Sequence, residues 1–127
     1  MTTLYVTLGI LVVLLGYGLY NFFYQRKVLT ALTQEEFIEG YRKAQLIDVR
    51  EPNEFESGHI LGARNIPLSQ LKMRLKEIRP DKPVYLYDHT GARSGRAAII
   101  LHKKGYKHLF YLKGGFKKWT GKIKVGK

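Results

Sequence analysis

The stretch LIDVREPNEF at residues 46–55 decides the fold of this chain. Together with Gln45, residues 46–49 are a short apolar run of the kind that forms a buried strand. Glu51 and Pro52 follow at once, and proline is favoured in the first turn of a helix, where its missing N–H is not needed. We therefore expect a strand at 45–49 that passes directly into a helical turn ending near Phe55.

The same alternation of strand and helix continues on both sides of this stretch. Further strands are predicted at about 63–66, 84–87 and 108–112, and helices at about 33–43, 69–78, 94–104 and 116–119. Thr33 and Glu36 have the spacing of a capping box at the start of the first of these helices. Strands that alternate with helices predict an α/β fold with a parallel sheet and helices on both faces.

The first 24 residues contain no charged side chain. As a helix, Leu4–Tyr24 would be about 31 Å long, enough to cross a hydrocarbon core about 30 Å thick. A cleaved signal would need a basic start and a small-residue cleavage site, and neither is present. We therefore expect an uncleaved transmembrane helix at 1–24, with aromatic residues such as Tyr24 at its ends suited to the membrane interfaces.

A basic juxtamembrane linker is expected at 25–32, because Arg26 and Lys27 follow the apolar segment directly. The positive-inside bias then places the N-terminus outside and the following domain in the cytoplasm. The sequence thus predicts a single-pass protein of the cell membrane, with one domain at 33–121 and a basic tail at 122–127.

Charge and cysteine content narrow the function classes. The chain has 22 Lys and Arg against 10 Asp and Glu, a formal net charge of +12. Such a domain is drawn to anions, here anionic lipid headgroups or an acidic protein partner, unless the charge only keeps the surface solvated. We do not expect nucleic-acid binding, because no pattern of exposed aromatic residues accompanies the lysines. The absence of cysteine excludes disulfides, thiolate metal sites and thiol nucleophiles, and we expect no cofactor or metal.

One loop has the features of an anion site. The strand at 84–87 ends, a polar segment follows, and a helix begins, which is where ligands bind in open α/β sheets. Loop amides and a helix N-terminus favour an anion, and Arg93 adds a positive charge. A plain strand–helix connection would have the same pattern. The predicted anion-binding loop consists of Asp88, His89, Thr90, Gly91, Ala92, Arg93 and Ser94.

Three stretches resemble the rhodanese-like family. They are residues 46–55 with Gly58-His-Ile60 and 62–67 (GARNIP), the loop at 88–94, and Gly114-Gly-Phe116 with Trp119. The resemblance covers about 33–120 and implies a parallel α/β fold. It also implies sulfur transfer through a cysteine at the first loop position, which carries a persulfide cradled by loop amides. Here that position is Asp88, so no catalytic residue is assigned, although Gly91 and Arg93 fit the pattern.

A carboxylate cannot form a persulfide, and the chain has no thiol. We therefore interpret the chain as a rhodanese-like module without sulfurtransferase activity, which binds an anion or a protein at the cytoplasmic membrane face. The alternative is an enzyme of the family, either a sulfurtransferase that uses an external thiol or a phosphatase-like hydrolase. Two arrangements of the loop stay open. The Asp88 carboxylate fills the cradle beside Arg93, or it points to solvent and leaves the cradle free.

Other polar residues are given structural roles. By the resemblance, Asp48 and Arg50 at the end of the first strand pair with each other or hold loops in place. His59 is expected to order the turn at 58–62, and Trp119 to lie in the core.

Overall fold

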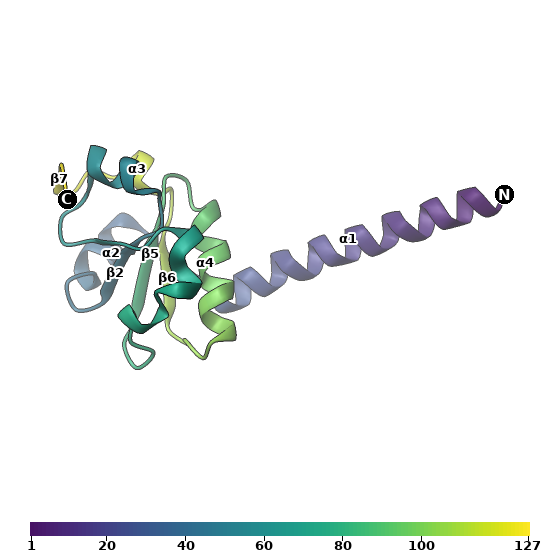
Figure 1. The fold of residues 1–127 in the computed structure, drawn as a ribbon, viewed down its shortest axis with the longest axis horizontal. Helices are drawn as coiled ribbons and strands as arrows, with labels where there is room; N and C mark the ends of the chain where they lie inside the picture. Colours follow the sequence, from purple (N-terminus) through teal and green to yellow (C-terminus); the bar gives the residue numbers. More distant parts are fainter.

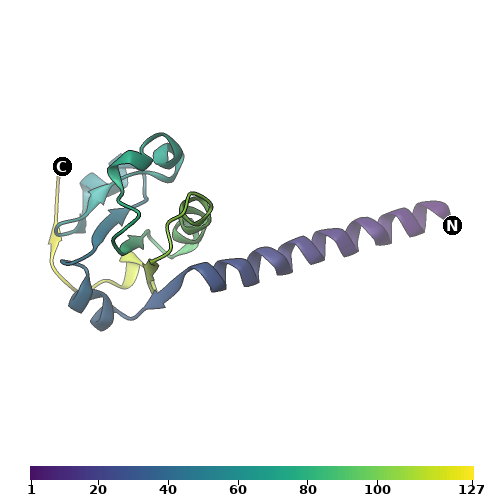
Figure 2. The same cartoon turned by 90° about the horizontal axis from the view of Figure 1, so that it is seen from below.

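The computed structural model describes the backbone of residues 1–127 and the side chains of residues 1–23 and 29–127. A long N-terminal helix, α1 (Thr2–Val28), leads into an α/β domain (Figures 1 and 2). Among the residues described, one helical segment, Thr2–Phe23, is long and apolar enough to cross a membrane. The side chains of Tyr24, Arg26 and Lys27, on which the expected interfacial and basic flank depends, lie outside the described residues.

A five-stranded parallel sheet forms the centre of the domain, as predicted. In spatial order its strands are β1 (Thr30–Leu32), β6 (Leu109–Leu112), β5 (Val84–Tyr87), β2 (Gln45–Asp48) and β4 (Arg64–Asn65). In the register of the two central strands, Asp48 lies opposite Tyr87. Because parallel strands end at the same edge, the segments that follow β2 and β5 leave the sheet side by side.

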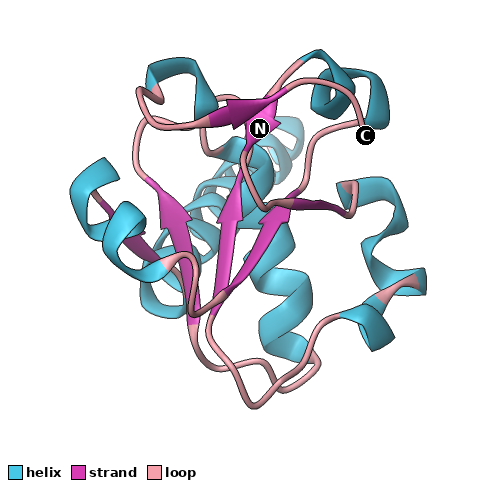
Figure 3. Cartoon of the chain, turned by 90° about the vertical axis from the view of Figure 1, so that its left-hand side faces the viewer, coloured by secondary structure: helices cyan, strands magenta, loops and turns pink.

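Helices cover both faces of the sheet (Figure 3), which confirms the predicted layering. They are α2 (Gln34–Gly40), α3 (Pro52–Ser57) and α4 (Ala92–Lys103), with 3-10 helices η1 (Leu68–Met73), η2 (Leu75–Glu77) and η3 (Phe116–Lys118). Neighbouring residues of one strand enter different cores. Leu46 and Tyr87 pack with Phe37 of α2, whereas Ile47 and Leu86 belong to the cluster on the α4 side. Strands buried on both faces explain why their sequences are continuous apolar runs rather than alternating ones.

Local signals set several boundaries where the sequence predicted them. Thr33 caps α2, with its hydroxyl accepting from the Glu36 amide while the Glu36 carboxylate accepts from the Thr33 amide, so the capping box is confirmed. Pro52 opens α3. Gly105, with φ of 96°, ends the turn after α4 in a backbone region that favours glycine.

Other elements differ from the expected ones. The helix predicted at 69–78 is two 3-10 helices separated at Arg74, and the Tyr106 hydroxyl donates to the carbonyl groups of Leu75 and Ile78. Carbonyl groups at the end of this segment thus accept hydrogen bonds from a side chain that lies elsewhere in the sequence. The linker expected at 25–32 also takes another form, because α1 continues to Val28 and 30–32 form the edge strand β1.

The expected basic tail contains a strand of its own. Residues Ile123–Lys124 form β7, which pairs antiparallel with β3 (His59–Ile60) in a separate two-stranded sheet. The Gly126 amide donates to the carbonyl of Glu56, so the end of the chain is fixed to α3.

Candidate functional site

The loop at 88–94 lies where β5 ends and α4 begins. Gly91 precedes α4 with φ of 114°, a left-handed backbone conformation that residues other than glycine rarely adopt. A Cβ atom there would also lie 3.4 Å from the Tyr111 ring. This glycine lets the chain turn sharply from the strand into the helix and brings the seven predicted residues together around the first turn of α4.

The Asp88 side chain is turned into this loop. It is 2% exposed, and its two oxygens have separate donors. Oδ2 accepts from the backbone N–H of Arg93 at 3.0 Å, and Oδ1 accepts from the Ser94 hydroxyl at 2.7 Å. The first N–H groups of a helix have no partner within the helix and attract negative charge. Of the two arrangements left open by the sequence, the carboxylate therefore lies inside the loop and not in solvent.

The Arg93 side chain has a different partner from the expected one. Its guanidinium donates to Glu54 Oε1 of α3 at 2.7 Å and makes no hydrogen bond to Asp88. This hydrogen bond raises the pKa of Arg93, with smaller contributions from the charge of Glu54 and then of Asp88, and it lowers the pKa of Glu54. Sequence reasoning missed Glu54, because nothing in its spacing relates it to a residue 39 positions away.

A second segment holds the loop from behind. The N–H of Phe116 donates to the Asp88 carbonyl at 2.8 Å, and the N–H of Lys117 donates to the His89 carbonyl at 3.2 Å. Gly115 allows this approach, since a Cβ atom there would lie 2.2 Å from the His89 carbonyl oxygen. The Gly114-Gly115 pair was identified from the sequence as part of a stretch that resembles the family, and its position against the loop was not expected.

Four amides of the loop remain unused. Within the described part of the chain, the N–H groups of His89, Thr90, Gly91 and Ala92 donate to no acceptor. His89, Thr90 and Ala92 are exposed, so an external group can reach this part of the loop. No group of three or more His, Cys, Asp or Glu side chains capable of holding a metal ion occurs among the described residues.

A buried ion pair supports the loop from the neighbouring strand. Arg50 and Asp48 pair at 2.8 Å, as the sequence predicted, and Arg50 also donates to the Gly58 carbonyl at 2.6 Å. Burial opposes the charge of Arg50, but the hydrogen bond and charge of Asp48 outweigh it and raise the pKa of Arg50. The guanidinium lies 4.5 Å from the centre of the Phe116 ring, so the same residue contacts the segment that holds Asp88.

His59 and Trp119 both have structural roles, although His59 contacts Phe55 of α3 rather than the turn at 58–62 that it was expected to order. His59 is 2% exposed, stacks on Phe55 and has its Nδ1 atom 2.8 Å from the Phe55 carbonyl. The Trp119 ring is partly buried and packs edge-on against Phe37 at 6.0 Å, at the edge of the core on the α2 side. Neither side chain contributes to the loop.

Comparison with known proteins identifies this architecture. The family described as "Rhodanese-like domain" matches residues 33–122. The chain belongs to the rhodanese-like family. Among its relatives is the uncharacterized protein YqhL of Bacillus subtilis, 66% identical over 111 residues that cover 87% of this chain and 88% of YqhL. Another is the thiosulfate sulfurtransferase PspE of Escherichia coli, 37% identical over 86 residues that cover 66% of this chain and 83% of PspE.

Solved structures agree with this membership. The rhodanese-related protein of Thermoplasma volcanium superposes with a TM-score of 0.70 at 26% identity, over 76% of this chain and 98% of that one. The thiosulfate sulfurtransferase of Pseudomonas aeruginosa gives a TM-score of 0.69 at 30% identity, and the match covers 76% of this chain but 20% of that one. This rhodanese-like domain thus has sulfurtransferases among its relatives, and it has Asp88 at the head of its loop.

Proposed function

We propose that this rhodanese-like domain is held at a membrane by α1 and acts as a binding module that carries no sulfur itself. One observation supports the proposal above the others. The residue at the head of the loop is a buried carboxylate with two hydrogen-bond donors, in a chain without cysteine. A persulfide needs a thiolate sulfur that attacks sulfane sulfur, and a carboxylate oxygen does not provide one.

The surface that binds is the mouth of the loop. The amides of 89–92 have no acceptor among the described residues, and Asp88 already occupies the first turn of α4. A small anion, or a carboxylate of a protein partner, would accept from those amides. Lysines near the end of the chain add favourable charge for an acidic partner.

A sulfur-transfer assay tests the negative part of the proposal. Full-length protein in mild detergent, incubated with thiosulfate and cyanide but no thiol, is expected to form no thiocyanate above the protein-free rate. Thiocyanate formation, or a sulfane sulfur atom on the protein by mass spectrometry, would contradict the proposal. Asp88→Cys is the companion variant. Its thiolate is expected to attack the outer sulfur of thiosulfate, forming a persulfide and releasing sulfite, and the unused amides of 89–92 would be available to that anion.

Membrane placement can be tested because the chain has no cysteine. The apolar segment Thr2–Phe23 is 22 residues long, about 33 Å as a helix, and the sequence after it is basic, which supports an outer N-terminus and a cytoplasmic domain. A membrane-impermeant maleimide should label Thr3→Cys in intact cells, and Lys127→Cys only after lysis. Labelling of both, or the reverse order, would refute this topology.

An enzymatic role is the second candidate, and the unused loop amides favour it. They would hold thiosulfate for attack by an external thiol, or a phosphate ester for hydrolysis. The test repeats the assay with glutathione and, separately, with p-nitrophenyl phosphate. A rate that exceeds the protein-free control and falls in Arg93→Ala would establish this candidate in place of the binding module.

A further inference from the structure

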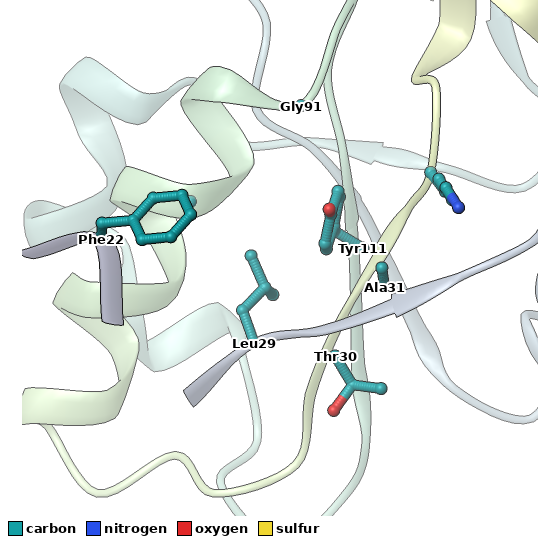
Figure 4. Close-up of a pocket in the computed structure, with 8 residues that line it drawn as sticks. Phe22, Leu29, Thr30, Ala31, Gly91 and Tyr111 are labelled. Carbon is teal, nitrogen blue, oxygen red and sulfur yellow. The ribbon is translucent and has the colours of Figure 1, made fainter. Parts of the chain in front are cut away.

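A hollow lies where the N-terminal helix meets the domain. It has a volume of about 630 Å³ and is bounded by Phe22 of α1, by Leu29 and β1, by the start of α4 and by the end of β6 (Figure 4). This volume is in the range of about 300–1,000 Å³ that small-molecule sites occupy. Figure 4 shows Phe22, Leu29 and Tyr111 around the same open space.

The lining of the hollow is amphipathic. Phe22 and Leu29 supply apolar surface, whereas Thr30, Tyr111 and Lys113 supply two hydroxyl groups and an ammonium group. None of the described residues that line it is acidic. A ligand that matches this lining carries a negative charge and polar oxygens at one end and hydrocarbon at the other.

The position of the hollow along α1 matches one layer of a bilayer. Phe22 lies near the end of the apolar segment Thr2–Phe23. The six steps along the helix from Phe22 to Val28 add about 9 Å along its axis. The headgroup layer on each side of a bilayer is roughly 5–8 Å thick. If α1 crosses the membrane as proposed above, the hollow therefore opens at the depth of the lipid headgroups.

We propose that this hollow binds the headgroup of an anionic phospholipid from the membrane that α1 crosses. The phosphate lies by the Lys113 ammonium and the hydroxyl groups of Thr30 and Tyr111, and the glycerol and first methylenes pack on Phe22 and Leu29. Gly91 also lines the hollow and belongs to the 88–94 loop. A bound lipid would therefore contact the same loop whose free end is proposed to bind a partner.

Native mass spectrometry of the full chain, released from nanodiscs of phosphatidylcholine with or without phosphatidylglycerol, tests this inference. Wild type should retain one phosphatidylglycerol molecule from mixed nanodiscs. A lysine near an anionic surface is worth about 1 kcal/mol, so Lys113→Ala should lower retention about fivefold. Lys124→Ala removes the same charge from exposed β7, outside the hollow, and should retain lipid like wild type. Thr30→Trp fills the hollow at an exposed edge-strand position without changing charge, and should also lose the lipid.

The outcomes separate this inference from the proposed function. Protein that enters nanodiscs but retains no phosphatidylglycerol overturns the inference and leaves the anchor intact. Equal losses in Lys113→Ala and Lys124→Ala, or full retention by folded Thr30→Trp, also overturn it, because binding would then follow net charge and not the hollow. Protein that fails to enter nanodiscs of either composition overturns the anchor itself.

Discussion

Replacing Asp88 by alanine tests how the loop is held. The change removes acceptors from the Arg93 amide and from the Ser94 hydroxyl, which belongs to a residue 1% exposed. Each buried donor left without an acceptor costs about 1–3 kcal/mol. Part of this loss is offset, because the variant no longer has to bury a charged carboxylate away from water. We expect a net loss of about 2–4 kcal/mol in the free energy of unfolding. Asp88→Asn keeps one acceptor and should lose about half as much.

Urea unfolding of the full chain in non-ionic detergent measures this loss. Trp119 is the only tryptophan and packs edge-on against the core residue Phe37, so its fluorescence reports unfolding of the domain. At a slope of about 1–3 kcal/mol per molar urea, the midpoint for Asp88→Ala should fall by roughly 1–2 M.

Sulfate provides the sharper comparison. In Asp88→Ala the Arg93 amide and the Ser94 hydroxyl lose their internal anion, so sulfate should bind there and stabilise the variant by about 2.7 kcal/mol at a hundredfold excess over its Kd, in addition to any sulfate effect at the amides of 89–92 that both proteins share. Sulfate also stabilises proteins in general, so only the difference from wild type at matched ionic strength is informative. Equal midpoints for wild type and Asp88→Ala, or equal shifts with sulfate, would refute the role of the Asp88 carboxylate as the internal anion of the loop.

Three further changes test the contacts around the loop. Gly115→Ala places a Cβ atom 2.2 Å from the His89 carbonyl oxygen, so we expect a loss of about 3 kcal/mol or more in urea unfolding, and an unchanged midpoint would contradict the proposed close contact. Glu54→Gln breaks the ion pair with Arg93, which is partly exposed and therefore worth at most about 1 kcal/mol. Folding lowers the pKa of Glu54, so the loss in free energy of unfolding should be complete above pH 4.5, the ordinary pKa of a Glu. The loss should vanish as the pH falls through the lower pKa of the folded state. A loss that persists at acidic pH would exclude the ion pair as its source. Arg50→Ala leaves a buried carboxylate without its partner and should cost about 3–5 kcal/mol by the same urea assay; a loss below about 1 kcal/mol would show that the pair does not hold the strand ends together.

The central fold could be predicted because its signals are local. The apolar runs of β2 and β5 lie between turn residues, and the Thr33–Glu36 box marks the start of α2 within four residues. β1 has no such signal. Its three residues become a strand because β6 offers a free edge, and the Lys113 amide donates to the Leu32 carbonyl. Strand formation of this kind depends on the partner more than on intrinsic preference.

The candidate site also has a part that the sequence predicted and a part that it did not. Its loop was found because residues 88–94 are consecutive, and a strand–loop–helix pattern is visible in one stretch of sequence. The contacts that fix the loop join distant segments. Glu54 reaches Arg93 from 39 positions away, and Gly115 approaches His89 from beyond β6. Such pairings follow from the order of strands in the sheet, which periodicity alone does not determine.

Only Leu29 separates α1 from β1, and this residue is itself buried. With α1 in a bilayer, no linker longer than this one residue would separate the membrane helix from the sheet. The domain would keep one height and one tilt above the lipid, with a constant face turned toward it. A soluble partner could then approach only from the remaining sides, while another membrane protein could meet the domain by lateral diffusion in two dimensions.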